Sequence, residues 1–203
     1  MIPQALIHYV ETEIIPRYEH FDKAHNRSHV QTVIDECLAL AELYPQADER
    51  HVYTIAAYNA TGHYRDRVSG EILAADSNLQ QGFGKEEMAI MREAVEDHRA
   101  SSDHEPRSIY GKIVAEADRI IDTDTTLRRT VQYGLKQNPA ADEAWHYQRF
   151  HKHLMEKYAP GGYLKLWLPD SKNAERLKEL QSIIADEVRL KSIFHRMFEE
   201  EKR

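Results

Sequence analysis

Apolar residues recur at three- and four-residue intervals in nearly every long segment of this 203-residue chain. The stretch 3–18 shows the pattern first, with Leu6, Val10, Ile14 and Tyr18 spaced four positions apart. Residues at this spacing share one face of an α-helix, whereas the alternation of a β-strand persists nowhere for more than a few positions. The pattern therefore predicts an all-α protein, and the chain length predicts one domain, residues 1–203.

Capping and helix-breaking residues divide the chain into the expected helices. Either Asn26 or Ser28 is expected to cap a helix that ends before Pro45, and Asp48 is expected to cap the next one. The expected helices cover about 3–18, 27–44, 49–60, 69–79, 85–99, 106–120 and 141–158, with one more capped near Asp124 or Thr125 and a last one from about Asn173.

Charge and composition narrow the functional classes. A net charge of −7 argues against a surface for long nucleic acid, although a small phosphorylated ligand can still bind in a local basic pocket. No apolar run approaches the about 18 residues of a membrane-spanning helix, and the first residues lack the pattern of a signal peptide. A cytoplasmic protein without a membrane partner is expected, and homo-oligomer formation is left open. The single cysteine, Cys37, is expected to be a buried thiol.

Polar residues on otherwise apolar helix faces are candidates for a functional site. His29 stands at the start of an apolar helical stripe, and Asp118 shares a face with Val114 and Ile121. A carboxylate on an apolar face is costly unless it is paired or binds a metal ion, so Asp118 is either a metal ligand or a salt-bridged structural residue. His25, four positions before His29, is either a second ligand on that face or a turn histidine beside the helix cap.

These candidates stand in strings that resemble one protein family. The strings read Arg-Ser-His-Val over 27–30, Ala-Ala-Tyr-Asn-Ala-Thr-Gly-His over 56–63, Glu-Asp-His-Arg over 96–99 and Glu-Ala-Asp-Arg over 116–119. They resemble the HD superfamily of metal-dependent phosphohydrolases, with a core over about 20–125 and a helical extension over about 126–203. The resemblance implies an HD-domain-like helical bundle with additional C-terminal helices. It also implies hydrolysis of a small phosphorylated metabolite or nucleotide with a divalent metal ion, namely Mn, Fe, Co, Ni, Zn or Mg.

The family is named for an adjacent His-Asp pair between the two outer metal ligands. Here Asn59 and Ala60 occupy those two positions, so only His29 and Asp118 of the four implied ligands remain. The amide oxygen of Asn59 and the ring of His63 are the candidate substitutes. We expect metal binding to be weak or absent and hydrolysis to be impaired in this chain. A deliberate double substitution and a naturally altered site both fit this loss.

Four more residues, on these strings or between them, are candidates for binding or hydrolysing a phosphate group. Arg99, Lys112 and Arg119 are expected to bind substrate, and solvated or ion-paired surface roles are the alternative for each. His98 is expected to act with Asp118 in catalysis, as general acid or outer ligand. The alternative for His98 is a ring N–H that is bonded to a nearby carboxylate.

Three functions follow from these interpretations. The first is an HD-type phosphohydrolase acting on a small phosphorylated ligand. The second is a non-catalytic module that binds such a ligand in the same pocket. The third is a helical protein that uses its tail helices for oligomer or partner contacts.

Overall fold

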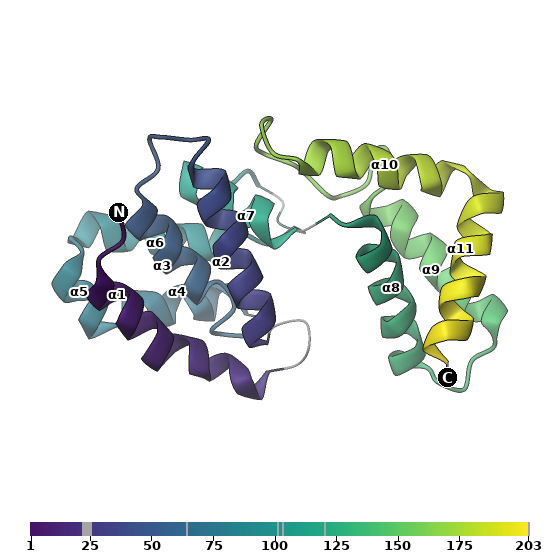
Figure 1. Cartoon of the computed structure of the whole chain (residues 1–203), viewed down its shortest axis with the longest axis horizontal. Helices are drawn as coiled ribbons and strands as arrows, with labels where there is room; N and C mark the ends of the chain where they lie inside the picture. Colours follow the sequence, from purple (N-terminus) through teal and green to yellow (C-terminus); the bar gives the residue numbers. More distant parts are fainter. Residues whose placement is uncertain (22–25, 64, 101, 103, 120, 203) are drawn as a thin grey trace. The chain divides into compact units, whose positions relative to one another are not determined.

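The computed structural model describes residues 1–21, 26–63, 65–100, 102, 104–119 and 121–202 of the chain. Within these residues every regular element is a helix, which confirms the predicted all-α class. The contacts divide the chain into two compact units (Figure 1). Unit 1 comprises Met1–Arg119 and Trp167–Ser171, and unit 2 comprises Ile120–Leu166 and Lys172–Arg203. The division falls close to the expected end of the core at about residue 125, and the single domain stays a prediction.

The N-terminal helical segment of unit 1 is present but irregular. It begins as α1 (Gln4–Tyr9), widens into the π-helix η1 (Val10–Ile14) and narrows into the 3-10 helix η2 (Ile15–His20). Pro16 explains the change, because proline has no N–H to donate and its ring crowds the preceding turn. The wider turn lets both Ile14 and Ile15 be fully buried.

Six further helices complete unit 1, and two predicted caps are confirmed. The Asn26 side chain accepts a hydrogen bond from the His29 N–H at 3.0 Å, and Asp48 accepts one from the Arg50 N–H at 2.8 Å. The helices are α2 (Arg27–Ala41), α3 (Glu49–Tyr58), α4 (Asp66–Ala74), α5 (Ser77–Gly82), α6 (Lys85–Asp97) and α7 (Ile109–Asp118).

One predicted helix, 69–79, is wrong as a single element. The chain forms α4 and α5 there, and Asp76 separates them. The Asp76 carboxylate accepts from the backbone N–H groups of Asn78 (2.9 Å) and Leu79 (3.2 Å), so it starts a new helix. An aspartate is a strong helix N-cap, and this local preference outweighs continuation of the earlier helix.

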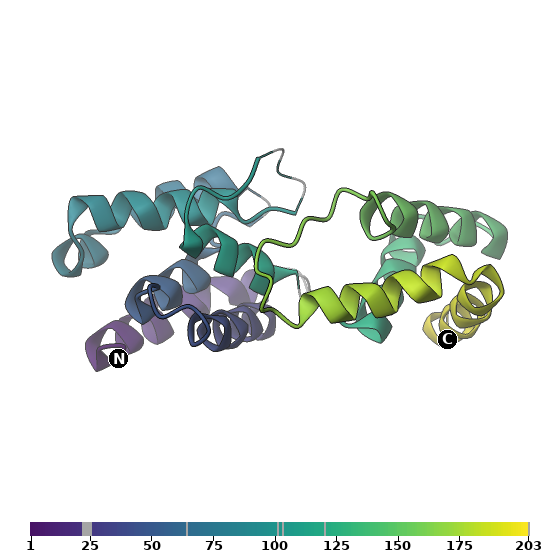
Figure 2. The same cartoon turned by 90° about the horizontal axis from the view of Figure 1, so that it is seen from above.

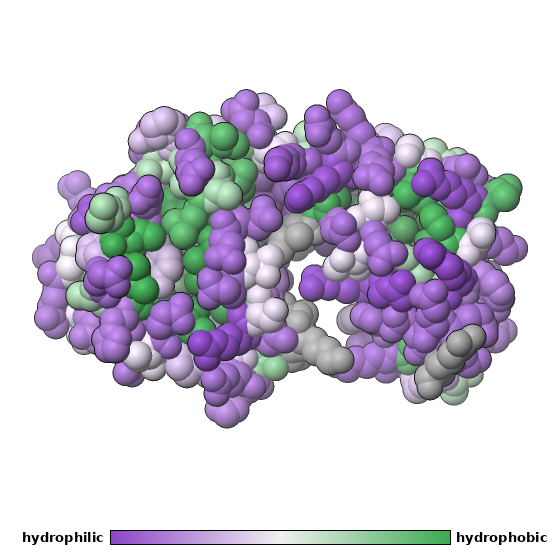
Figure 3. All heavy atoms as spheres, in the orientation of Figure 1, coloured by the Kyte–Doolittle hydropathy of each residue, from purple (hydrophilic) through white to green (hydrophobic). Residues whose placement is uncertain are grey.

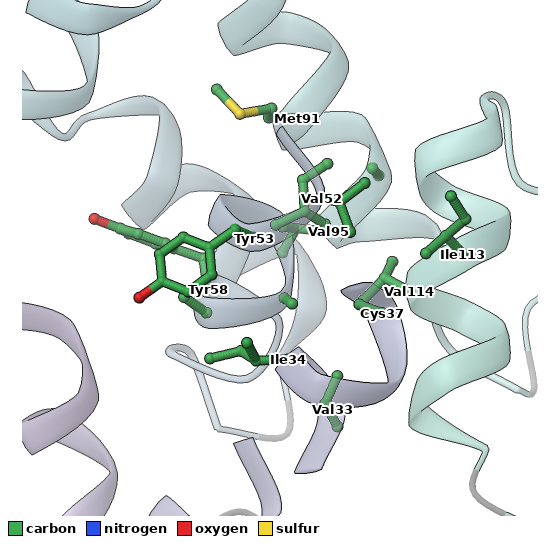
Figure 4. Close-up of a cluster of buried hydrophobic side chains, with 14 of the residues drawn as sticks. Val33, Ile34, Cys37, Val52, Tyr53, Tyr58, Met91, Val95, Ile113 and Val114 are labelled. Atoms are coloured by element: carbon green, nitrogen blue, oxygen red, sulfur yellow. The ribbon is translucent and has the colours of Figure 1, made fainter. Parts of the chain in front are cut away.

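The core of unit 1 surrounds α3, in which every residue of 51–58 is buried. Side chains of α2, α6 and α7 gather around it (Figure 4). Burial of each Val, Leu or Ile side chain stabilises the fold by about 1.5–3 kcal/mol. The predicted burial of Cys37 is confirmed, and it lies among these side chains. The labelled members are Val33, Ile34, Cys37, Val52, Tyr53, Tyr58, Met91, Val95, Ile113 and Val114.

Unit 2 contains the remaining four helices, and two of its predicted boundaries differ from the structure. Asp122, not Asp124 or Thr125, caps α8, since it accepts from the Thr125 N–H at 2.8 Å. The helix expected from Asn173 is two helices, because Asp186 caps a second one. The helices, seen together in Figure 2, are α8 (Thr123–Gln137), α9 (Glu143–Lys157), α10 (Asn173–Ala185) and α11 (Glu187–Glu201).

The surface of the described helices carries both apolar and hydrophilic side chains (Figure 3). None of them is long and apolar enough to cross a lipid bilayer. Over unit 1, apolar side chains reach the surface among hydrophilic ones (Figure 3). A groove of ≈ 390 Å³ in unit 1 is lined by residues of α1 and α5 and their neighbours, among them Leu6, Tyr9 and Phe83.

Candidate functional site

His29 and Asp118 are in direct contact in unit 1. The Nε2 atom of His29 lies 3.2 Å from the Oδ1 atom of Asp118, and the two side chains are 10% and 29% exposed. His29 lies in the first turn of α2, where the Asn26 cap holds its backbone, and Asp118 is the last residue of α7. The packing of α2 on α7 therefore brings together two residues far apart in the sequence.

The Asp118 carboxylate is stabilised in its charged form. Burial alone raises its pKa, but the hydrogen bond from His29 outweighs this effect, together with the charges of His98, His29 and Arg119. The net result is a pKa of about 2. Asp118 is therefore an anion at neutral pH. It can pair with a cation or accept a hydrogen bond from the His29 ring.

Asn59 directly follows α3 and is 1% exposed. Neither its amide oxygen nor its amide nitrogen has a hydrogen-bond partner among the described residues. Tyr18 fixes the turn around it, donating to the Ala57 carbonyl at 2.8 Å and accepting from the Ala60 N–H at 3.3 Å. A buried polar group without a hydrogen bond destabilises the fold by about 1–3 kcal/mol. A ligand that bonded to the Asn59 amide would remove this cost.

The end of α3 and the start of α2 lie at the same end of the helical core. The two helices are consecutive and pack against each other, so they run in opposite directions. The C-terminal end of α3, with Asn59, thus lies beside the N-terminal part of α2, with His29. Ala60, which follows Asn59, is also buried, at 4% exposed.

His63 lies just beyond the end of α3, and its ring packs against an aromatic side chain. Its ring stacks on Phe21, with the centroids 4.7 Å apart. Its backbone has φ of 58°, a left-handed conformation that costs a non-glycine residue about 1–2 kcal/mol. The described contacts place its ring in aromatic packing, and its ligand role stays a prediction. His25 lies outside the described residues.

One ring nitrogen of His98 has a backbone hydrogen-bond partner. It follows α6, is 7% exposed, and its Nδ1 atom lies 2.6 Å from the Val95 carbonyl oxygen. Because a carbonyl only accepts, Nδ1 carries a hydrogen and donates it to the Val95 carbonyl. The Nδ1 partner is thus a carbonyl, not the carboxylate considered as the alternative. The influence of His98 on the Asp118 pKa places its charge near that carboxylate.

The three candidate phosphate-binding cations differ in their contacts. Arg99 donates to Asp66 at 2.5 Å and Lys112 pairs with Glu105 at 2.5 Å, as the ion-paired alternative predicts for both. Arg119 follows α7, and its buried Nε and Nη1 atoms have no hydrogen-bond partner in the described part of the chain. Burial lowers the Arg119 pKa, against the charges of Glu116 and Asp118. Of the three, Arg119 has donors available for a ligand.

The residues present do not fit a tightly held metal ion. Over the described ranges, no three His, Cys, Asp or Glu side chains gather as a ligand group. His29 and Asp118 supply two donors, and Asn59 supplies only a neutral amide oxygen. A first-row metal site in a protein normally has at least three strong side-chain ligands.

Sequence reasoning missed the role of Glu116, two positions before Asp118. Glu116 is fully buried, accepts from the Trp167 N–H at 3.0 Å and from the Ser171 hydroxyl group, and so binds the segment 167–171 to α7. The sequence does contain an indication of this role, because Glu116 is a carboxylate surrounded by apolar residues on the same helix as Asp118. Glu116 therefore positions the helix that carries the candidate site.

Comparison of the chain with models of protein families, with curated proteins and with solved structures gave no match. The HD resemblance therefore depends on the sequence strings and stays a prediction.

Proposed function

We propose that unit 1 is an HD-type phosphohydrolase scaffold that binds a small phosphorylated metabolite or nucleotide. Its metal-dependent hydrolysis is impaired by Asn59 and Ala60. The contact between His29 Nε2 and Asp118 Oδ1, at 3.2 Å, carries this proposal. These are the two outer ligands implied by the resemblance, and two ligands of one metal ion, each about 2 Å from it, stand roughly 3–4 Å apart.

The chain's own groups are suited to hold an anion beside Asp118. Arg119 offers buried N–H donors, and Asn59 offers a buried amide N–H. His98 can donate a proton from Nε2 when its ring is charged. Because the present residues do not fit a tightly held metal ion, no hydrolytic step is assigned to them.

A non-catalytic binding module is the second candidate, favoured by the unbonded groups of Asn59 and Arg119. Buried polar groups are nearly always hydrogen-bonded in folded proteins. A bound ligand with phosphate or carbonyl oxygens would satisfy the N–H groups of both residues.

The test of the hydrolase scaffold is reversion of the two altered positions. Element analysis should find more Mn, Fe, Co, Ni or Zn in the double variant Asn59→His/Ala60→Asp than in the parent chain. Turnover of nucleotides or of a generic phosphodiester should rise with it. Each single variant should recover less than half of either effect, because metal ligands act as a unit.

A matched control is the pair Asn138→His/Ala140→Asp, which makes the same changes in the turn between α8 and α9 of unit 2. It should leave metal content and turnover unchanged. Overpacking at buried positions costs about 1–3 kcal/mol, so the melting temperature of each variant must be measured with and without metal. A folded double revertant that takes up no metal would contradict the hydrolase scaffold. Stoichiometric metal in the parent chain would contradict the impaired site.

Thermal-shift measurements with nucleotides and sugar phosphates separate the binding module from a helical interaction protein. A ligand at 100 times its Kd stabilises the folded state by about 2.7 kcal/mol, and Arg119→Gln should reduce that shift. An interaction protein without the unit 1 pocket should show the same shift, or none, in the parent chain and in Arg119→Gln.

A further inference from the structure

Unit 2 contains a cavity of ≈ 420 Å³ that no part of the proposed function uses. The start of α8 forms one side of it, and residues of α10 and α11 form the others. Apolar side chains, among them Leu127, Ile183 and Met197, form part of its wall. Small-molecule sites commonly have volumes of about 300–1,000 Å³ and combine apolar walls with a few polar groups.

Three arginines line this cavity: Arg176 from α10, and Arg189 and Arg196 from α11. None of their guanidinium groups forms an ion pair or a hydrogen bond with another described side chain. Arg128, by contrast, pairs with Asp124, Glu200 and Glu201 in the same unit. Arg176 has an electrostatic interaction with Asp122, whereas Arg189 and Arg196 have no partner among the described side chains, and an anion in the cavity could supply one.

The acidic residues at the cavity do not cancel this charge completely. Asp122 accepts from the Thr125 N–H and interacts electrostatically with Arg176. Asp124 is paired with Arg128 at 3.3 Å. The third, Glu179, is an exposed residue of α10. Arg189 and Arg196 therefore keep positive charge that these carboxylates do not neutralise.

A buried hydroxyl group provides an independent observation at the same place. The Oγ1 atom of Thr123, in the first turn of α8, is buried and has no hydrogen-bond partner among the described residues. Thr123 also lines the cavity. Its hydroxyl can donate to a ligand oxygen, at a helix N-terminus whose partial positive charge favours anions.

We propose that this cavity of unit 2 binds the phosphate group of a small phosphorylated molecule, held by Arg176, Arg189, Arg196 and the Thr123 hydroxyl group. Guanidinium groups match phosphate oxygens in bidentate geometry, and a hydroxyl completes such a site. The site uses none of the residues proposed for unit 1, so it stands whether or not unit 1 is a phosphohydrolase.

The charge of unit 2 favours a small molecule over a nucleic acid. Unit 2 has 15 Lys and Arg residues and 12 Asp and Glu residues, whereas unit 1 has 12 and 22. Unit 2 therefore has a small excess of positive charge, and three of its arginines line one cavity, an arrangement that suits a compact anion. Long nucleic acid needs basic residues spread along an extended surface.

Isothermal titration calorimetry with inorganic phosphate and with pyrophosphate tests the proposal on the full chain. We expect both probes to bind and added salt to weaken the binding. Arg189→Gln and Arg196→Gln should each weaken it at least about tenfold, because each removes a charge-assisted hydrogen bond. Both residues are exposed, so the variants should fold. The matched control is Lys178→Gln, an exposed cation of α10 outside the cavity, which should bind as the parent does.

Further variants separate the unit 2 site from the unit 1 site, and an RNA probe separates a small anion from a nucleic acid as the ligand. Arg119→Gln in unit 1 should leave the unit 2 binding unchanged, and Thr123→Val should weaken it. The proposal is overturned if neither probe binds, if the folded arginine variants bind like the parent, or if Lys178→Gln weakens binding equally. It is also overturned if a single-stranded RNA oligonucleotide binds through Arg189 and Arg196 while pyrophosphate does not.

Discussion

His29 and Asp118 form a hydrogen-bonded pair between the first turn of α2 and the last residue of α7. The pair links positions 29 and 118, and most of the buried core residues of unit 1 lie between them in the sequence. The contribution of this pair to the free energy of unfolding can be measured without a bound ligand.

Loss of this pair should destabilise the protein. Asp118→Asn removes the charge that the His29 ring bonds to, and we expect the free energy of unfolding to fall by about 1.5–3 kcal/mol. Urea denaturation at pH 7 measures the change. The control, Asp35→Asn, alters an exposed carboxylate that accepts from Gln31 on α2, and it should change stability by less than about 0.5 kcal/mol. Equal effects of the two substitutions would contradict a stabilising role of the pair.

Asp76 predicts a pH dependence of stability. The hydroxyl groups of Tyr9 and Tyr58 both donate to its Oδ2 atom at 2.6 Å. Burial acts to raise the Asp76 pKa, but these two bonds and the backbone N–H bonds lower it below its usual value. A carboxylate with a lowered folded-state pKa stabilises the fold above its unfolded-state pKa of about 4, and the contribution is lost as pH falls below that value.

Tyr58→Phe should reduce this pH dependence and destabilise the protein by about 1–3 kcal/mol at pH 7, because the variant removes one donor from a partly buried carboxylate. Chemical denaturation between pH 2 and about 6 measures both effects. Tyr133→Phe is the control, since that side chain is 54% exposed, and it should change neither quantity. A stability curve with the same slope for parent and Tyr58→Phe would show that the tyrosine does not lower the Asp76 pKa.

The buried thiol should react slowly. Cys37 is fully buried, and desolvation raises its pKa well above the usual value, with smaller contributions from Asp118 and Glu36. Little thiolate therefore exists at pH 8, and the thiol is shielded from reagents. We expect a thiol-reactive dye to label the native protein far more slowly than the urea-unfolded protein. Labelling within seconds under native conditions would instead show that this part of the core opens readily.

Glu116 should be essential for order in the segment 167–171. Glu116→Gln keeps the size of the side chain and removes its charge, so the two charge-assisted bonds to Trp167 and Ser171 become weaker neutral ones, with the amide oxygen accepting from the Trp167 N–H and the amide N–H donating to the Ser171 hydroxyl. We expect a loss of about 1–3 kcal/mol in stability and faster hydrogen exchange at the Trp167 amide, measured by mass spectrometry. Glu42→Gln, at an exposed carboxylate, is the control and should leave the exchange rate unchanged. Unchanged exchange in Glu116→Gln would mean that other contacts hold the segment.

The helical class and most helix positions could be predicted because periodicity and caps are local properties of the sequence. The caps Asn26 and Asp48 are such cases, whereas the caps at Asp76 and Asp186 divide segments that periodicity alone reads as continuous. The contact of His29 with Asp118 fits the role of outer metal ligands, which the strings around the two residues imply. The contacts of Glu116 with the segment 167–171 depend on tertiary packing, and no spacing in the sequence encodes them.

The attachment of the segment 167–171 to Glu116 has a consequence for the connectivity of the molecule. The chain leaves unit 1 after Arg119, returns to it at Trp167 and leaves again after Ser171. A protease that cut the peptide backbone near residue 120 would therefore not produce two independent fragments. The downstream fragment would keep one segment embedded in the upstream one, and the nicked protein would elute as a single species until the fold was denatured.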